Sequence, residues 1–312
     1  MKLLKGFHNL GNTCYLNSTL QCFIYDPLFK QLIKLNELNV NLLINSLQDI
    51  VNTNKPVYNL VDFIKEFIKQ KPFFEGFKQN DSHEFYIHFI DILSNISNEL
   101  IPENNKGFEN LSLPDRLFGD FLKRNNSPFT PIYHGQTRTN IRCCVCNNIK
   151  EVYEEYNSIN LHVPKTTNKT LKVTDLFKNY LGTELHDDPN NLYHCDYCNK
   201  NQVTHKQISL WKLPPRLIVV LKKYSDNIIN YQTVVEFPLE PIKIRETSSG
   251  LIKSYQLTGV VYHQGSFNYG HYHSKVLVDD NWYYIDDHFV KSINTMKNTS
   301  RKVYMLFFNL TD

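Results

Sequence analysis

The chain has 312 residues with 34 basic and 31 acidic side chains, so its formal net charge is only +3 when its histidines are counted as neutral. This balance excludes a dedicated polyanion-binding protein, because nucleic-acid modules of this size usually carry a concentrated basic excess. Hydrophobic residues make up 41% of the chain and charged residues 21%. That is a globular composition, long enough for one large core or two modest ones.

The first residues give no sign of export. Met1–Gly11 contains Lys2 and Lys5 and lacks an apolar core of signal-peptide length. The strongest apolar run, Leu217–Leu221, is far shorter than the roughly 18 residues that a membrane span requires. We therefore expect a soluble intracellular protein, cytoplasmic or nuclear, that has no membrane partner.

A cysteine stands at the predicted start of a helix. In the segment Gly6–Gln21, Cys14 follows a loop containing glycine and asparagine, and apolar residues at helical spacing begin at Leu16. The unpaired N–H groups of a first helical turn favour the thiolate, the reactive form of cysteine. Asn12 or Thr13 is the expected cap. The alternative is a small buried hydrophobic residue, because a nucleophile also needs a base, a group that orients the base, and an oxyanion site.

Two parts of the chain differ in periodicity. From about Leu16 to Ser97 the apolar residues recur at helical spacing, which predicts a mostly helical first third. From about Thr137 onward, short alternating or β-branched runs predict mostly antiparallel strands. These predicted strands are Glu151–Leu161, Arg216–Tyr224, Val234–Pro238, Tyr255–His263, His273–Val278, Trp282–Asp286 and Val303–Asn309. The predicted loops are Asn125–Pro131, Asp187–Asn191 and Glu246–Gly250.

Four of the seven cysteines form two Cys-x2-Cys pairs, Cys143 with Cys146 and Cys195 with Cys198. Two such knuckles can supply four thiolates to one tetrahedral Zn2+, and turn-prone asparagines follow each pair. We expect a structural zinc, with the knuckles at the ends of long hairpins that meet in space. The alternative is four unrelated buried cysteines. An odd number of cysteines in a chain without an export signal argues against a disulfide framework.

A candidate base lies near the other end of the chain. His271 stands between two strand-like runs, and Trp282–Asp287 ends an aromatic strand in two carboxylates. Antiparallel pairing of 272–278 with 281–286, reversing at Asp279–Asn281, would bring Asp286 close to His271. A carboxylate there accepts the imidazole N–H and fixes the tautomer. The alternatives are a surface histidine and solvated turn charges.

These segments resemble the ubiquitin-specific protease family of cysteine deubiquitinases. Gly6–Gln21 looks like the family's cysteine box, and Tyr255–Tyr272 with Trp282–Val290 looks like its histidine box. Between them, Lys78–Phe85 resembles the family's Gln-Gln-Asp-Ala-His-Glu-Phe motif, and Leu213–Tyr224 resembles its strand that usually ends Leu-Lys-Arg-Phe. The paired knuckles stand in the family's order, so the resemblance covers nearly the whole chain.

The resemblance implies a Cys-His-Asp triad. Cys14 corresponds to the nucleophile and His271 to the general base that later protonates the leaving amine. Asp286 corresponds to the residue that orients the histidine, and the neighbouring Asp287 is a second candidate for that role. Asn9 corresponds to the oxyanion-hole side chain, with the backbone N–H of Cys14 as a second donor. A simple turn residue is the alternative for Asn9.

The resemblance also implies contacts with the ubiquitin tail, Leu-Arg-Leu-Arg-Gly-Gly. Asp81 and Glu84 are the candidates to pair with its arginines, and helix-surface charge is the alternative for both. The other candidate substrate-binding residues are Gln79, His263, Gly270 and Tyr272. His263 is interpreted as a loop or tail contact and not as the base. The loops 225–233 and 264–270 correspond to the family's blocking loops.

The fold that the resemblance implies is α+β, a papain-like ubiquitin-specific protease fold with a helical thumb, an antiparallel β palm and zinc-tipped β fingers. We expect one catalytic domain over residues 1–312. The thumb covers about 1–112, the fingers about 137–210, and the palm about 113–136 and 211–312. The nucleophile on the thumb then faces the histidine on the palm across a cleft that only glycines can pass.

The expected function is hydrolysis of the (iso)peptide or thioester bond after the C-terminal glycine of ubiquitin, with one structural Zn2+ per chain. The expected partners are ubiquitin and ubiquitinated proteins, with no nucleic acid, and we expect a monomer. Two alternatives stay open: a protease for another ubiquitin-like modifier, and a catalytically idle ubiquitin-binding scaffold. The sequence also leaves open whether a regulatory partner protein must align the triad.

Overall fold

The computed structural model describes residues 4–35, 41–76, 78–97, 111–165, 169–225, 228–229, 232–266 and 269–311. Of the two expected blocking loops, residues 226–227, 230–231 and 267–268 lie outside this part. The N-terminal portion is helical, as predicted, and its helices are α1 (Cys14–Ile24), α2 (Pro27–Leu35), α3 (Leu42–Asn52), α4 (Val61–Gln70) and α5 (Ser82–Ser97). A short parallel pair, β1 (Gly6–Phe7) with β2 (Val57–Tyr58), and the 3-10 turn Pro72–Phe74 complete it.

The helical region extends further along the chain than its periodicity predicted. Helix α6 (Leu113–Arg124) begins after Ser112, whose hydroxyl accepts from the Asp115 N–H and so caps the first turn. Helix α7 (Thr130–Tyr133) begins inside the predicted loop Asn125–Pro131, with Pro131 in its first turn, where a missing N–H costs no hydrogen bond. The loop prediction was therefore wrong for its last two residues.

The largest sheet has eight strands in the order β19-β18-β17-β16-β21-β11-β5, with β15 also paired to β16. Its strands are β5 (Ser158–His162), β11 (Arg216–Lys222), β15 (Ile242–Arg245), β16 (Ile252–Gly265), β17 (Gly270–Val278), β18 (Asn281–Asp286), β19 (Phe289–Ile293) and β21 (Val303–Leu310). All pairs are antiparallel except β11 with β5. The sheet is thus mostly antiparallel, as expected, with one parallel pair that the sequence did not predict. The chain makes a long crossover between these strands, and a crossover permits parallel pairing.

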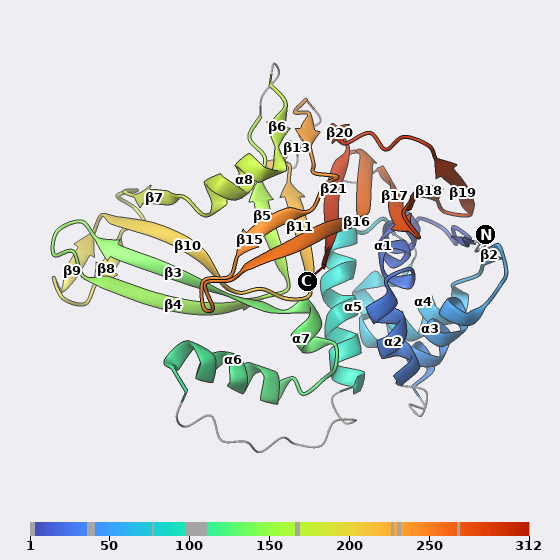
Figure 1. The fold of residues 1–312 in the computed structure, drawn as a ribbon, viewed down its shortest axis with the longest axis horizontal. Coiled ribbons are helices and arrows are strands. Elements are labelled where there is room, and N and C mark those ends of the chain that lie inside the picture. Colours follow the sequence, from blue (N-terminus) through green and yellow to red (C-terminus); the bar gives the residue numbers. More distant parts are fainter. Residues whose placement is uncertain are drawn as a thin grey trace.

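A second sheet of four strands projects from the first (Figure 1). It consists of β4 (Ile149–Tyr156), β3 (Gly135–Cys143), β10 (Thr204–Lys212) and β7 (Thr183–His186), all antiparallel. A short hairpin, β8 (Tyr193–Cys195) with β9 (Lys200–Gln202), lies at its outer end (Figure 1). Smaller pairings join β6 (Leu171–Lys172), β14 (Val235–Glu236) and β20 (Thr299–Ser300), and β12 (Tyr224–Ser225) with β13 (Ile228–Ile229).

Two predictions for the strand-rich half need correction, and one helix in it was not predicted. The predicted strand Glu151–Leu161 is two strands, because Asn157 ends β4 and β5 joins the other sheet. Within the predicted strand Val234–Pro238, only Val235–Glu236 forms a strand. Helix α8 (Val173–Tyr180) interrupts the strands, and it buries Val173, Leu176 and Phe177 on one helical face.

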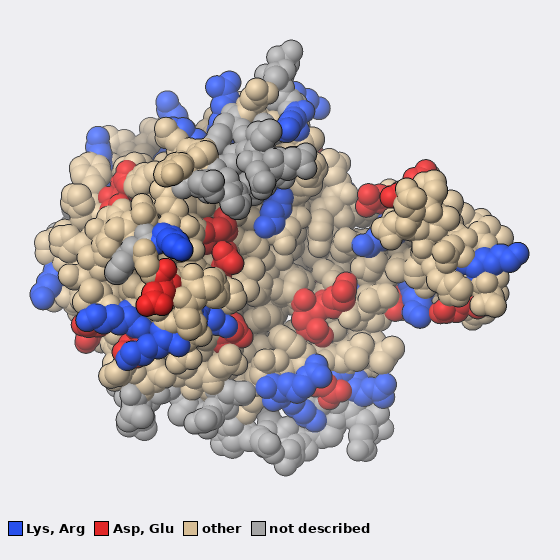
Figure 2. Space-filling view, turned by 180° about the vertical axis from the view of Figure 1, so that it is seen from behind, with Lys and Arg blue, Asp and Glu red and all other residues tan. Residues whose placement is uncertain are grey.

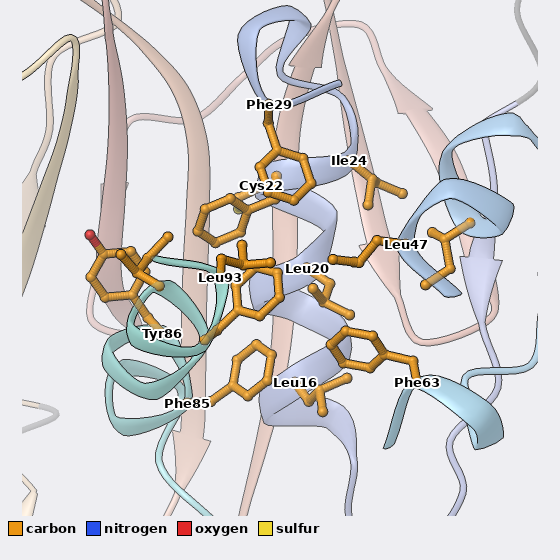
Figure 3. Close-up of a cluster of buried hydrophobic side chains, with 14 of the residues drawn as sticks. Leu16, Leu20, Cys22, Ile24, Phe29, Leu47, Phe63, Phe85, Tyr86 and Leu93 are labelled. Carbon is orange, nitrogen blue, oxygen red and sulfur yellow. The ribbon is translucent and has the colours of Figure 1, made fainter. Parts of the chain in front are cut away.

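Helix α1 lies in the middle of the larger core. Every residue of this helix is buried, and it packs between α5 and the large sheet (Figure 3). Leu16 and Leu20 lie near the aromatic side chains of α4 and α5, among them Phe63 and Phe85, whereas Ile24 lies near Leu47 of α3 (Figure 3). A buried helix in close-packed surroundings has few alternative positions, so the core fixes where α1 begins.

The large sheet separates two cores. Along β21, Tyr304 and Met305 belong to the helical core, whereas Leu306 and Phe308 belong to a second core on the opposite side. The second core includes residues of α8. On the face shown in Figure 2, basic and acidic side chains are interspersed, in keeping with the small net charge. No helix in the described ranges is long and apolar enough to cross a membrane.

Candidate active site

Cys14 is the first residue of α1, as predicted from the spacing that follows it. The chain turns into the helix through Gly11 at φ 100° and Asn12 at φ 56°, both in the left-handed region. The predicted side-chain cap was wrong for Thr13, which stands at the N-cap without a capping hydrogen bond. Its hydroxyl instead accepts from the Leu10 N–H. Cys14 therefore lies at the positive end of the helix, and only 4% of this residue is exposed.

His271 and Asp286 meet through the register of a hairpin. Strands β17 and β18 pair as expected, with Val278 opposite Asn281 and Ser274 opposite Ile285. His271 Nε2 lies 2.6 Å from Asp286 Oδ1. A carboxylate can only accept, so Nε2 carries the proton in this contact and Nδ1 is the ring nitrogen that remains for the thiol.

The imidazole of His271 lies between the thiol and the carboxylate. A hydrogen bond with Cys14, reinforced by one with Asp286, raises the pKa of His271 from 6.5 to about 9, against the opposing effect of partial burial. The pKa of Asp286 is lowered by hydrogen bonds from His271 and Tyr284, which outweigh its burial. At neutral pH the histidine is therefore protonated beside an ionised carboxylate, which is the charge state that supports a neighbouring thiolate.

Asp287 lies beside the pair but contacts other residues. Its Oδ2 accepts from Asn9 Nδ2 at 2.8 Å, and its Oδ1 accepts from Asn17 Nδ2 at 2.7 Å. Of the two acidic candidates, the histidine is bonded to Asp286. The amide oxygen of Asn9 accepts from the N–H groups of Gly11 and Thr13, at 3.0 and 3.2 Å, so Asn9 is held in the loop directly before the nucleophile.

The candidate substrate-binding residues fall into two groups. Gln79 and Asp81 belong to the structure around the site: Gln79 Oε1 accepts from the Gly270 N–H, and Asp81 Oδ1 accepts from the N–H groups of His83 and Glu84 at the start of α5. Asp81 Oδ2 accepts from the hydroxyl groups of Tyr304 and Tyr272, at 2.6 and 3.4 Å. Glu84, by contrast, is exposed on α5.

His263 is buried beneath the site. The centre of its ring lies 4.4 Å from the centre of the Tyr272 ring. Burial lowers the pKa of His263 to about 4, so this histidine is neutral at physiological pH. A Cβ atom on Gly270 would come within 2.0 Å of His263 Nε2. The residue before His271 must therefore be glycine for this ring to occupy its position.

The four knuckle cysteines converge at the outer end of the second sheet. All four sulfur atoms lie within 4.8 Å of one another, with Cys143 3.9 Å from Cys198 and Cys146 3.6 Å from Cys195. Asn147 and Asn199, which follow the two pairs, have φ of 59° and 48° and provide the tight turns. Four convergent sulfur donors suit a tetrahedral metal ion, so this cluster can hold one.

The expectation about the hairpins was half wrong. The first knuckle closes the long hairpin β3–β4, but the second closes the short hairpin β8–β9, whose strands have three residues each. A short hairpin suffices, because its two sulfur atoms meet those of the neighbouring hairpin in one cluster. Of the other cysteines, Cys144 is exposed and Cys22 is buried in the helical core.

Two residues of the site were missed by the sequence analysis. Asn17 contacts Asp287, and Tyr284 donates its hydroxyl to Asp286 Oδ2 at 2.8 Å. Both carried a signal: Asn17 is three residues after Cys14 on the same helix face, and Tyr284 is two residues before Asp286 on the same strand face.

The family model described as ubiquitin carboxyl-terminal hydrolase matches residues 5–308. Among curated proteins, ubiquitin carboxyl-terminal hydrolase 2 from Bos taurus is 25% identical to this chain, over 98% of the chain and 55% of its own length. The chain thus spans about half the length of this relative.

Solved structures resemble the chain over its whole length. A chain of the SAGA Ubp8/Sgf11/Sus1/Sgf73 DUB module bound to ubiquitin aldehyde has a TM-score of 0.80 and 23% identity, covering 100% of this chain and 70% of that one. The module bound to monoubiquitin gives a TM-score of 0.79 at 22% identity, with the same coverage. These likenesses establish that the chain shares the α+β fold of those structures.

Proposed function

Because the chain belongs to the ubiquitin carboxyl-terminal hydrolase family, we propose that it is a thiol-dependent deubiquitinase. It hydrolyses the (iso)peptide or thioester bond after the C-terminal glycine of ubiquitin. The observation that carries the proposal is the 2.6 Å contact of His271 Nε2 with Asp286 Oδ1, on a histidine whose pKa the nearby Cys14 raises, together with Asn9 held in the loop directly before Cys14. A nucleophile, a base, an orienting acid and an oxyanion donor are the four parts that acyl transfer to a thiol needs.

Each residue has one role in the proposed reaction. The Cys14 thiolate attacks the carbonyl carbon of the terminal glycine, and the negative charge moves to the carbonyl oxygen. An N–H of Asn9 and the backbone N–H of Cys14 stabilise this oxyanion. Imidazolium His271 then protonates the leaving amine as the C–N bond breaks, which leaves an acyl-thioester. Neutral His271 next removes a proton from water, whose attack releases the ubiquitin carboxylate and the thiol.

Asp286 is proposed as the third member of the triad, in preference to Asp287. Support comes from its 2.6 Å contact with His271 Nε2, which fixes the tautomer and stabilises the imidazolium. Asp287 contacts Asn9 instead, so its proposed role concerns the oxyanion side of the reaction.

We propose that ubiquitin is the substrate and that its tail lies between α1 and β17. The structural relatives are solved with ubiquitin aldehyde and with monoubiquitin, which supports this substrate class. Exposed Glu84 is the residue proposed to pair with a tail arginine. The described contacts of Gln79, Asp81, His263 and Tyr272 support an indirect role for them, in which they hold Gly270 and the loop before His271.

The proposed subdivision is a thumb at about 1–112, fingers at about 137–210 and a palm formed by the remainder. The helical N-terminal part, the projecting four-stranded sheet and the large sheet support it. All the triad contacts form within one chain, which supports activity of a monomer without an aligning partner. An intracellular location, cytoplasmic or nuclear, follows from the proposed substrate.

We propose Zn2+ as the metal held by Cys143, Cys146, Cys195 and Cys198, one ion per chain and structural in role. The donor set of four thiolates fits zinc and leaves no open coordination position. Metal analysis of the purified protein should give about one Zn2+ per chain. Metal-free protein that is folded and stable would contradict a structural role.

The deciding experiment uses ubiquitin with a C-terminal alkyne, which reacts only with a nucleophile positioned at the tail. Wild-type protein should form a covalent adduct at Cys14, and Cys14→Ala should form none. A ubiquitin substrate with a fluorescent leaving amine should be turned over by the wild type. An idle scaffold would bind ubiquitin without turnover, and a protease for another modifier would react with a probe built on that modifier.

A further inference from the structure

Polar side chains link helix α1 to the edge of the candidate active site. Asn17, one turn after Cys14 on α1, donates from Nδ2 to Asp287 Oδ1 at 2.7 Å and to the His8 carbonyl oxygen at 3.3 Å. The other carboxylate oxygen of Asp287 accepts from Asn9 Nδ2 at 2.8 Å. The nucleophile's own helix is thus connected to the proposed oxyanion donor through one carboxylate.

The orientation of the Asn17 amide follows from its partners. Both are acceptors, so the nitrogen must face them. The amide oxygen then points into the protein, where it is buried without a hydrogen-bond partner among the described residues. An unpaired buried carbonyl oxygen lowers the stability of the folded chain, because the group loses its hydrogen bonds to water. An apolar residue would avoid this cost at a position that is 1% exposed. An amide here therefore indicates that the contact with Asp287 serves a purpose other than stability.

Asp287 needs support in its conformation. Its φ of 49° lies in the left-handed region, which non-glycine residues seldom adopt. Its carbonyl oxygen accepts from the Phe7 N–H at 2.8 Å, and its carboxylate accepts from two asparagines. Gly6 makes the approach of the N-terminal segment possible, because a Cβ atom there would lie 2.4 Å from the His288 carbonyl oxygen.

Asn9 is oriented by the groups at both ends of its amide. Its oxygen accepts from the N–H groups of Gly11 and Thr13, and its nitrogen donates to Asp287. A primary amide has two N–H donors, and Asp287 accepts from one of them. The other is left to face a developing oxyanion. Without Asp287 the amide could rotate about its terminal torsion, which has a broad and shallow energy profile.

We propose that Asn17 is a positioning residue for the oxyanion site. It fixes the carboxylate of Asp287, and Asp287 in turn fixes the amide plane of Asn9. This inference rests on the proposed function. Asn17 is placed to touch neither the substrate nor the reacting atoms, and it acts on Asn9 through its shorter hydrogen bond, the one to Asp287.

The main test compares Asn17→Leu with Gln21→Leu. Gln21 is a matched control because it is also a buried amide on α1, one turn further along. Its oxygen likewise lacks a partner among the described residues. Its nitrogen donates to the Lys5 carbonyl oxygen, away from the site. We expect kcat on the fluorescent ubiquitin substrate to fall roughly 10- to 100-fold in Asn17→Leu, because a misplaced oxyanion donor loses most of its effect. KM and the rate of Cys14 alkylation by iodoacetamide should stay at wild-type values. Equal losses in both variants would overturn the proposal.

Ubiquitin aldehyde gives a readout that general destabilisation would not move. Its hemithioacetal with Cys14 is tetrahedral and carries the oxygen that stands for the oxyanion. Affinity for the aldehyde should fall in proportion to kcat in Asn17→Leu, whereas affinity for unmodified ubiquitin should not change. Asn17→Leu added to Asp287→Ala should cause no further loss, since both act through one carboxylate. Additive losses would refute the linkage.

Two further measurements keep the inference separable from the proposed function. Crystal structures of the wild type and Asn17→Leu, without substrate, should show Asn9 leaving Asp287 in the variant, and an unchanged Asn9 would refute the proposal whatever the substrate. If Asn17→Leu does not fold, Asp287→Ala alone should reproduce the loss in kcat with an unchanged KM. Absence of turnover in the wild type refutes the function but leaves the crystallographic test decisive.

Discussion

The protonation state of His271 affects both the stability of the fold and the proposed reaction. The folded pKa of about 9 lies above the usual 6.5, so the protonated form stabilises the folded chain. That contribution is complete below pH 6.5 and is lost as the pH rises through about 9. The same deprotonation removes the acid that protonates the leaving amine, so kcat/KM should decline on the alkaline side near this value.

Replacing Asp286 by asparagine should move this alkaline limb. The variant loses the carboxylate that raises the pKa of His271, so the limb in a kcat/KM profile should shift to lower pH, with a fall in the maximum of about a hundredfold. Asp280→Asn is the matched control, because it removes the same charge from the exposed turn of the same hairpin. An unshifted limb in Asp286→Asn would show that another group orients the histidine.

Gly270 should tolerate no side chain. In Gly270→Ala the new methyl group would overlap the His263 ring, which is packed against Tyr272. The backbone beside His271 must then move, and we expect turnover to fall at least tenfold and stability to fall by about 1–3 kcal/mol. Gly182→Ala serves as a control, since its nearest contact is 3.2 Å. Chemical denaturation and turnover of both variants check the prediction, and wild-type behaviour of Gly270→Ala would contradict it.

At the scale of elements, the four clustered cysteines join the long hairpin β3–β4 to a short hairpin that has little other support. The hairpin β8–β9 pairs only three residues on each strand, which is marginal for a hairpin in water. The sulfur cluster and the exposed ion pair Lys150–Asp196 link it to β3–β4. Binding of a metal ion by four thiolates supplies free energy that the strand pairing cannot.

Cys143→Ser should therefore lower both the zinc content and the thermal midpoint. Cys143 is buried inside the cluster, while its neighbour Cys144 is exposed and lies outside it. Cys144→Ser should keep about one Zn2+ per chain and the wild-type midpoint. The measurement is metal analysis paired with calorimetry. Equal behaviour of the two variants would show that the four cysteines hold no structural metal.

The elements that were predictable are those specified by local sequence. The hairpin that brings His271 to Asp286 reverses at Asp279 and Asp280, which both adopt positive φ, as tight hairpin turns require. Its register follows from that turn. The start of α1 at Cys14 followed from the preceding loop and the apolar spacing.

What sequence reasoning missed depends on contacts between distant segments. The Asn17–Asp287 hydrogen bond joins residues 270 positions apart, and the parallel pairing of β5 with β11 depends on a long crossover. Neither leaves a periodic trace. Helix α8 does have apolar residues at helical spacing, but it is only eight residues long and lies between strands. A short apolar run of that length fits a helix or a strand.

At the scale of the whole molecule, one buried ion pair joins the helical part to the large sheet. Asp26, between α1 and α2, accepts two hydrogen bonds of 2.7 Å from the guanidinium of Arg216 at the start of β11. The two side chains are 7% and 11% exposed. Asp26 also accepts from the Leu28 N–H and so supports the start of α2.

Arg216→Met should destabilise the entire chain, because it leaves a buried carboxylate without its partner. We expect the free energy of unfolding to fall by about 3 kcal/mol, and part of the loss to be recovered in the double variant Asp26→Asn with Arg216→Met. The exposed pair Lys69–Glu66 provides the comparison, where Lys69→Met should cost no more than about 0.5 kcal/mol. Urea unfolding measures all three variants. A loss in Arg216→Met no larger than that in Lys69→Met would contradict this account.

The hydrogen bond between Asn9 and Asp287 spans 278 positions of the chain. A ribosome adding about 5–20 residues per second takes roughly 15–55 s to cover that distance. During this time the nascent chain exposes the Cys14 thiol without its base, His271, and with an Asn9 side chain that lacks its carboxylate partner, Asp287. A chain that ends before His271 and Asp286 lacks the two residues that pair beside Cys14, so the proposed active site can form only after nearly every residue of the fold has been made.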